Sequence, residues 1–157
     1  MNILADTGIL LRLVNNQDLE HIVVRRAFEA LLEEGHSFVM TMQNVCEYWS
    51  AATRPATSRG GFGLSCQEAL SHLNGLEELV SWLPEPPEIL EVWSKLIEEH
   101  GILGTRAHDT RLAAAMICHD IPSILTLNGR DFRRFTPIVV LDARNLGQER
   151  PAEGSNP

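Results

Sequence analysis

The first thirteen residues constrain the fold more than any other segment. The apolar run Ile3–Ala5 stops abruptly at Asp6, and apolar residues resume over Ile9–Leu13. A run this short and this apolar is typical of a strand covered on both faces, as in parallel sheets flanked by helices. We therefore predict a buried strand, a tight turn at Asp6–Gly8 and a short helix. Asp6 then ends a strand where open α/β sheets face their ligand crevice, although simple capping of the next helix explains an aspartate here as well.

The rest of the chain alternates between helical and extended patterns. Further strands are predicted at Ser37–Thr41, Ser81–Leu83, Ser123–Thr126 and Ile138–Leu141. Further helices are predicted at Asp18–Glu34, Gln43–Thr53, Ser65–Ser81, Pro86–Gly101 and His108–Asp120. Strands that alternate with helices indicate a parallel sheet with helices on both faces.

The length of 157 residues, 44% of them hydrophobic, suits one core rather than two. We expect a single domain over residues 1–146. Residues 147–157 contain no apolar side chain larger than alanine, and we expect a disordered tail there. No stretch reaches the roughly 18 apolar residues of a membrane span, and no secretory signal pattern opens the chain. These features predict a soluble, cytoplasmic protein without a membrane partner.

The net charge of −8 argues at first sight against a nucleic-acid partner, because such partners favour basic surfaces. The distribution of charge weakens that objection. Residues 18–104 carry five cations against fourteen carboxylates, whereas residues 105–150 carry seven arginines against five carboxylates. Twelve of the thirteen cations are arginine, the side chain suited to bidentate phosphate contact. A biased base composition of the genome explains the same arginine excess.

Four acidic side chains are notable for their positions. Asp6 ends the first predicted strand, Glu47 lies inside a helix among aromatic and small residues, Asp109 lies in the first turn of a helix, and Asp131 follows the fourth strand. Each has an ordinary explanation when taken alone: a helix cap or helix start for the three aspartates and a solvent-facing side chain for Glu47. Taken together, three of the four fall at carboxyl ends of strands or in the helix turn that borders the same crevice.

Carboxylates that share one crevice raise each other's pKa unless a cation intervenes. Mg²⁺, with Mn²⁺ as a substitute, fits this requirement, because these ions prefer carboxylate and water oxygens and leave positions open for a substrate phosphate. The cysteines Cys46, Cys66 and Cys118 are far apart and form no Cys-x-x-Cys pair, so they indicate neither a zinc site nor a disulfide framework. We expect them to be buried free thiols.

Several segments resemble one known family. Asp6-Thr7 at a strand end, the helical Glu47, the run His108–Met116 and the segment Ile124–Phe132 look like those of the PIN-domain ribonucleases. The closest likeness is to the VapC-type toxins of bacterial type II toxin–antitoxin pairs, and it covers roughly residues 1–142 in order and spacing. The resemblance implies a three-layer α/β/α PIN-like domain whose central parallel sheet has the strand order 3-2-1-4-5.

By position, the resemblance also implies a Mg²⁺-dependent endoribonuclease. Asp6 and Asp109 become the principal metal ligands, Glu47 ligates the ion or orients a water molecule, and Asp131 completes the catalytic and metal-binding set. Members of the family resemble one another in forming homodimers and in being inhibited by a cognate antitoxin protein. The side chains expected to hydrogen-bond the carboxylates or a water are Thr7, Thr126 and Asn128. The arginines expected to contact RNA phosphates are Arg54, Arg106 and Arg130.

Two other classes of function stay open at this point. A metal-dependent phosphohydrolase acting on small phosphoesters, similar to haloacid-dehalogenase-like enzymes, needs a second aspartate two residues after the first, and Gly8 fills that place. A non-catalytic α/β binding module of the receiver type has a lysine after a late strand, whereas Lys95, the sole lysine, lies in a predicted helix. The endoribonuclease toxin of a toxin–antitoxin pair is therefore the function we expect.

Overall fold

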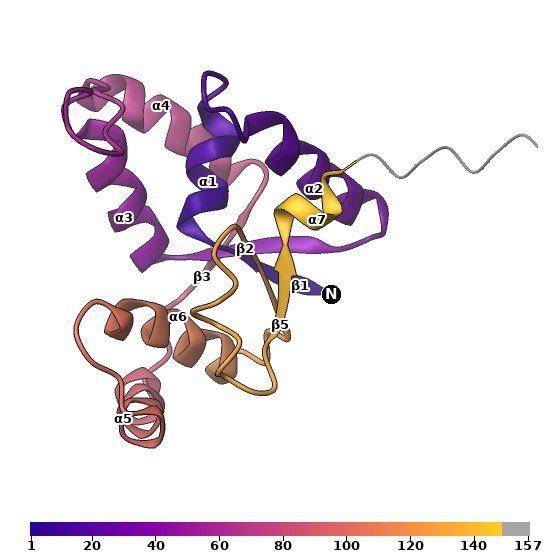
Figure 1. Ribbon diagram of the computed structural model, residues 1–157, viewed down its shortest axis with the longest axis vertical. Helices are drawn as coiled ribbons and strands as arrows, with labels where there is room; N and C mark the ends of the chain where they lie inside the picture. The colour runs from indigo at the N-terminus through magenta and orange to yellow at the C-terminus, as the bar shows by residue number, and fades with distance from the viewer. Residues whose placement is uncertain (149–157) are drawn as a thin grey trace, which may run out of the picture.

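The computed structural model describes residues 1–148, which form a parallel sheet covered by helices on both faces (Figure 1). The strands are β1 Asn2–Ala5, β2 Ser37–Thr41, β3 Ser81–Leu83, β4 Ser123–Thr126 and β5 Val139–Asp142. The helices are α1 Thr7–Val14, α2 His21–Glu33, α3 Met42–Thr53, α4 Cys66–Glu77, α5 Ile89–His100, α6 Arg106–Cys118 and α7 Ala143–Leu146. The strand order β3-β2-β1-β4-β5, with all neighbours parallel, confirms the predicted three-layer PIN-like architecture.

Strand β1 lies at the centre of the sheet because both of its faces are covered. Ile3, Leu4 and Ala5 have no exposed surface. Ile3 and Ala5 pack into the core beneath α1, α2, α3, α4 and α7, whereas Leu4 packs into the second core beneath α5 and α6. Figure 1 shows these two helical layers on opposite sides of the strands. Burial on both faces explains why the opening apolar run does not alternate with polar residues.

Three local predictions are wrong. The expected tight turn at Asp6–Gly8 is absent within the described residues, because Asp6 leads directly into α1. Residues 143–146, for which no helix is predicted, form α7, which begins where the Asp142 carboxylate accepts a hydrogen bond from the backbone N–H of Arg144 at 2.9 Å. The cysteines are not buried: Cys46 and Cys66 are exposed on α3 and α4, and Cys118 is partly exposed.

The end of the described chain packs against the domain. Gly147 follows α7 and is buried, and its Cα lies so close to α2 that an added Cβ would meet the carbonyl oxygen of Val23 at 2.2 Å. The tail predicted for residues 147–157 falls mainly on residues 149–157, which lie outside the described residues. Among the helices of residues 1–148, none combines the length and apolar character needed to cross a membrane.

This close approach predicts that Gly147→Ala is destabilising. The new methyl group must displace the Val23 backbone, and overpacking of this kind costs about 1–3 kcal/mol of unfolding free energy. The matched control is Gly75→Ala in α4, where the added Cβ would meet no described atom within 4 Å apart from its chain neighbours and the backbone of its own helix, and helix propensity should raise stability by about 0.5–1 kcal/mol. Urea unfolding of both variants measures the difference. Equal stability of Gly147→Ala and the parent protein would contradict this packing.

Candidate functional site

Asp6 stands where β1 meets β4 and α1. Its backbone N–H donates to the carbonyl of Leu125 at 3.0 Å, which continues the pairing of β1 with β4 by one residue. In the part of the chain that the structure describes, the Asp6 carboxylate makes no N-cap hydrogen bond to α1. Its Oδ2 instead accepts a hydrogen bond from Thr126 Oγ1 at 2.5 Å. Asp6 is thus the N-cap residue of α1 by position, and Thr126 also holds its carboxylate from β4.

Glu47 lies on α3 with both carboxylate oxygens engaged. Thr7 Oγ1 donates to Glu47 Oε2 at 2.6 Å, and Gln43 Nε2 donates to Glu47 Oε1 at 2.8 Å. Thr7 Oγ1 in turn accepts a hydrogen bond from Asn44 Nδ2 at 3.2 Å. The carboxylate is thus fixed between α1 and its own helix, and a purely solvent-facing role does not fit it.

The start of α3 sets the direction of these side chains. Thr41 ends β2 and is also the N-cap residue of α3, so no loop separates strand and helix. Asn44 Oδ1 accepts the backbone N–H of Thr41 at 2.9 Å, and Thr41 Oγ1 accepts the backbone N–H of Asn44 at 3.4 Å. This reciprocal capping box satisfies two backbone donors at the helix start. The box directs the Asn44 side chain toward Thr7. Gln43 and Glu47 lie on the same helix, one turn apart.

Thr126 links Asp6 to the turn that carries Asp131. Its hydroxyl donates to Asp6 and accepts the backbone N–H of Asn128 at 2.9 Å. The Asn128 side-chain amide then donates to the Asp131 carboxylate. The three polar side chains predicted around the carboxylates, Thr7, Thr126 and Asn128, therefore each contact one of the four acidic residues.

Asp109 completes the acidic group from the first turn of α6. Burial, followed by the negative charges of Asp131, Asp6 and Glu47, raises the pKa of Asp109 to about 6. Burial likewise raises the pKa of Asp6, an effect partly offset by the hydrogen bond from Thr126. The influence of Asp131, Asp6 and Glu47 on Asp109 indicates that the four acidic side chains predicted from sequence are neighbours at the edge of the sheet where its strands end, the place at which open α/β sheets have their ligand crevice.

The donor chemistry of this crevice fits a hard divalent ion. Its side chains offer carboxylate, hydroxyl and amide oxygens. The pKa of Asp109 is raised by burial and then by the neighbouring negative charges, and a bound cation would offset both effects. Within residues 1–148, no three His, Cys, Asp or Glu side chains are arranged to hold an ion by themselves. Mg²⁺ usually needs only one or two carboxylates, with water and substrate completing its shell. The crevice therefore suits an open Mg²⁺ site and not a closed protein cage.

The candidate arginines differ in their surroundings. Arg106 and Arg130 are exposed, and they lie three residues before Asp109 and one residue before Asp131. Arg54 follows α3, and its guanidinium donates to the carbonyl of Arg59 at 3.2 Å and to a serine hydroxyl one turn earlier in the helix. Arg106 and Arg130 are therefore close in sequence to Asp109 and Asp131, whereas Arg54 is held at the C-terminal end of α3.

Sequence reasoning missed two polar residues next to the carboxylates. Gln43 donates to Glu47 from one helical turn earlier, and Arg111 Nη1 donates to Gln43 Oε1 at 3.0 Å. The i,i+4 spacing of Gln43 and Glu47 was an available signal. No comparable signal exists for Arg111, because 68 residues separate it from Gln43 and only the tertiary fold brings them together.

The sequence profile of the PIN domain family matches residues 3–136. No curated protein matches the sequence significantly.

Solved structures similar to the chain include VapBC-1 from nontypeable Haemophilus influenzae, with a TM-score of 0.64 at 21% identity over 91% of this chain and 98% of that one. FitAcB from Neisseria gonorrhoeae gives a TM-score of 0.65 at 17% identity over 91% of this chain and 98% of that one. VapC20 from Mycobacterium tuberculosis is a toxin that cleaves the sarcin-ricin loop. It gives a TM-score of 0.55 at 18% identity over 78% of this chain and 86% of that one. The fold thus extends over most of each of these chains.

Proposed function

The chain belongs to the PIN domain family, and from this premise we propose that it is a Mg²⁺-dependent endoribonuclease that acts as the toxin of a toxin–antitoxin pair. The observation that carries the proposal is the set of hydrogen bonds that holds Asp6, Glu47 and Asp131 through Thr126, Thr7 and Asn128, with Asp109 in the first turn of α6. The raised pKa of Asp109, caused by burial and then by the other three carboxylates, agrees with it. PIN nucleases generally use a divalent metal, and the oxygen-rich donor set of the crevice suits one.

In this proposal Asp6 and Asp109 are the principal ligands of the ion, and Asp131 and Glu47 complete the set. A bound Mg²⁺ supplies Lewis-acid polarisation of a phosphate oxygen and charge stabilisation in the transition state. Glu47, held by Thr7 and by its helical neighbour, orients the attacking water and accepts its proton. The water oxygen bonds to phosphorus as the P–O3′ bond breaks, and the departing oxygen takes a proton from solvent. The products carry a 5′-phosphate and a 3′-hydroxyl.

Two features support RNA as the substrate. Arg106 and Arg130 are exposed cations beside Asp109 and Asp131, where they are suited to hold the phosphates that flank a scissile bond. We assign Arg54 the contact with a more distant phosphate, because it lies two turns along α3 from Glu47. A structurally similar protein, VapC20, cleaves the sarcin-ricin loop, which favours structured RNA over single-stranded oligonucleotides.

The proposal includes a cognate antitoxin and a homodimer as partners. VapBC2 from Rickettsia felis, which gives a TM-score of 0.65 at 15% identity over 90% of this chain and 98% of that chain, was solved as a complex with promoter DNA. FitAB gives a TM-score of 0.66 at 17% identity over 92% of this chain and 96% of that chain, and its structure was solved bound to a DNA fragment. These complexes support an antitoxin partner. We place the protein in the cytoplasm, where its RNA substrate is available.

Cleavage products test this function directly. We expect purified protein with Mg²⁺ to cut a labelled RNA hairpin into fragments that RNA ligase rejoins without end repair, because they carry 5′-phosphate and 3′-hydroxyl groups. Chelation by EDTA should stop the reaction, and p-nitrophenyl phosphate should stay intact. Intact RNA at enzyme excess would contradict a ribonuclease, and 2′,3′-cyclic phosphate ends would contradict hydrolysis by water. Release of p-nitrophenol would indicate a phosphohydrolase of small phosphoesters instead.

A further inference from the structure

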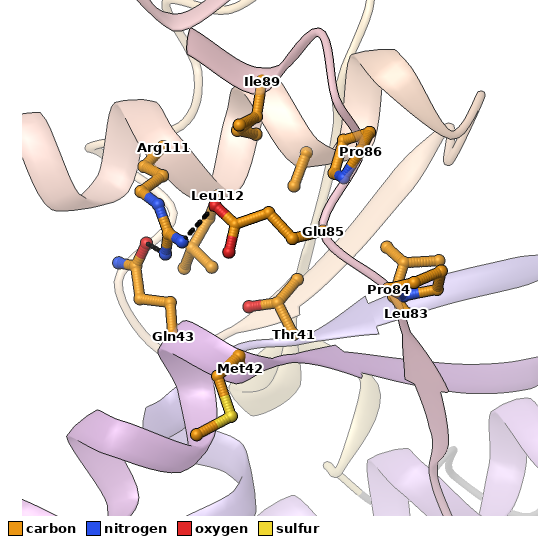
Figure 2. A pocket seen from close by; sticks show the side chains of 11 residues that line it. Thr41, Met42, Gln43, Leu83, Pro84, Glu85, Pro86, Ile89, Arg111 and Leu112 are labelled. Atoms are coloured by element: carbon orange, nitrogen blue, oxygen red, sulfur yellow. Dashed lines mark hydrogen bonds and ion pairs between the residues drawn. The ribbon is translucent and has the colours of Figure 1, made fainter.

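The contacts that hold Glu47 continue through three side chains from separate parts of the chain. We use the name Gln43 bridge for these three side chains, which are Gln43 of α3, Arg111 of α6 and Glu85 of the segment between β3 and α5. Figure 2 shows the guanidinium of Arg111 between the other two, with dashed lines to the Gln43 amide and the Glu85 carboxylate. The bridge thus joins the Glu47 helix to the Asp109 helix and to a third segment.

The Gln43 amide has one favourable orientation. Its residue is 7% exposed, and its Nε2 donates to Glu47 Oε1 at 2.8 Å and to the backbone carbonyl of His108 at 2.9 Å. Its Oε1 accepts from Arg111 Nη1 at 3.0 Å. Rotating the amide by half a turn would set its oxygen against two acceptors and its NH₂ group against a guanidinium. Three complementary contacts therefore lock the side chain that holds Glu47.

The same amide also fixes the start of α6. His108 and Arg111 stand immediately before and two residues after Asp109 in that helix. Because Gln43 bonds to both, it joins the turn that carries Asp109 to the helix that carries Glu47, across 65 residues of sequence. One buried amide therefore sets the position of two of the four carboxylates relative to each other.

The placement of charge in the bridge also favours a positioning role. Arg111 is held by Glu85 at 2.6 Å, and both side chains are partly exposed, so their ion pair orients the guanidinium but adds little stability. The neutral Gln43 stands between this arginine and Glu47. A direct ion pair would engage the Glu47 charge, whereas an amide spacer orients the carboxylate and leaves its charge available to a cation.

We propose that Gln43 and Arg111 are positioning residues, which hold Glu47 and the first turn of α6 in the geometry that metal binding and RNA hydrolysis require. The inference rests on the proposed nuclease function for its kinetic readout. Partners that hold metal ligands in this way typically change affinity or activity 10- to 100-fold when they are removed. Arg111, one contact further from Glu47, should have the smaller effect of the two.

Gln43→Met tests the inference, because methionine keeps the length of the side chain and removes all three hydrogen bonds. We expect kcat for a cleaved RNA hairpin to fall about 10- to 100-fold with KM changed less than about threefold, and the Mn²⁺ dissociation constant, measured by electron paramagnetic resonance, to rise about 10-fold. Arg111→Gln should also lower kcat and raise the Mn²⁺ dissociation constant, but by smaller factors than Gln43→Met. The matched control is Arg25→Gln, which removes an exposed arginine–glutamate pair of 2.7 Å on α2 and should change neither value.

A double-mutant cycle separates positioning from general structural support. In a Glu47→Gln background, Gln43→Met should lower activity by a smaller factor than in the parent protein, because the part of its effect that passes through Glu47 is already lost and only the part that passes through the start of α6 remains. Effects that multiply would overturn the positioning role, as would parent-like kcat and Mn²⁺ affinity in Gln43→Met. If Gln43→Met does not fold, Arg111→Gln decides by the same readouts. If the parent protein leaves RNA intact, the proposed nuclease function fails separately. An unchanged Mn²⁺ dissociation constant in Gln43→Met would then still overturn the positioning role.

Discussion

Asp109→Asn should lower kcat/KM for RNA cleavage by about 1000-fold or more while the protein stays folded. The carboxylate is placed in the first turn of α6 beside three other acidic groups, and the amide that replaces it lacks the charge that a divalent ion requires. Metal-assisted stabilisation of transition-state charge is worth several kcal/mol, and about 4 kcal/mol corresponds to a factor of about 1000 in rate. Single-turnover cleavage of an RNA hairpin by the parent and the variant measures this loss.

Asp120→Asn is the matched control for this variant. Asp120 follows the other end of α6, is exposed, and has a backbone φ of 53°, a conformation that asparagine adopts readily. The change removes one negative charge from the same part of the chain without touching the crevice, so activity should stay within about twofold of the parent. Equal activity of Asp109→Asn and the parent protein would contradict the proposed site, provided that circular dichroism shows both variants folded.

A divalent ion should stabilise the parent protein about twice as much at neutral pH as at pH 5. At a free Mn²⁺ concentration of about 100 times its dissociation constant, linkage gives about 2.7 kcal/mol at pH 7.5, or a rise in Tm of roughly 5–10 °C for a domain of this size. At pH 5 the gain should fall to about 1.4 kcal/mol, because protons then compete with the ion for Asp109 and weaken its binding about 10-fold. Differential scanning calorimetry at both pH values, with and without Mn²⁺, measures the effect.

The sign of the pH dependence follows from the raised pKa of Asp109. Its value in the folded protein, about 6, lies above the ordinary value of 3.8, so the folded state binds this proton more tightly than the unfolded state. The group therefore stabilises the metal-free fold fully below about pH 3.8, and this contribution is lost as pH rises through about 6. Asp109→Asn should lack both this loss and the Mn²⁺ response. A Tm of the parent protein that is insensitive to Mn²⁺ at pH 7.5 would contradict the proposed site.

The strands were largely predictable from sequence, and their order also accounts for the position of Asp6 relative to Asp131. Ser37–Thr41, Ser81–Leu83 and Ser123–Thr126 have the predicted bounds, because short apolar runs with polar boundaries can be buried in only a few ways. Once the strands are parallel and Asp6 and Asp131 follow two adjacent ones, their side chains must emerge at the same edge of the sheet. Convergence of acidic groups therefore follows from topology and not from any local pattern.

The remaining features depend on tertiary contacts that local patterns do not encode. The predicted turn after β1 is wrong because β1 ends at Ala5 and α1 begins at Thr7, so that Asp6 alone connects them, and its side chain accepts a hydrogen bond from Thr126, 120 residues away. Helix α7 is only four residues long, too short for a periodic signal, and it packs against α2. The Gln43–Arg111 contact likewise joins two helices whose relative position only the folded core defines.

The central claim is that Asp6 and Asp109, which lie far apart in the sequence, bind one divalent ion at the site that Glu47 and Asp131 border. The most direct test is a crystal structure of the protein grown with Mn²⁺, with diffraction recorded at the manganese absorption edge. The account predicts an anomalous peak contacted by carboxylate oxygens of both Asp6 and Asp109. Manganese bound only elsewhere on the surface, with Asp6 and Asp109 contacting protein groups alone, would contradict it.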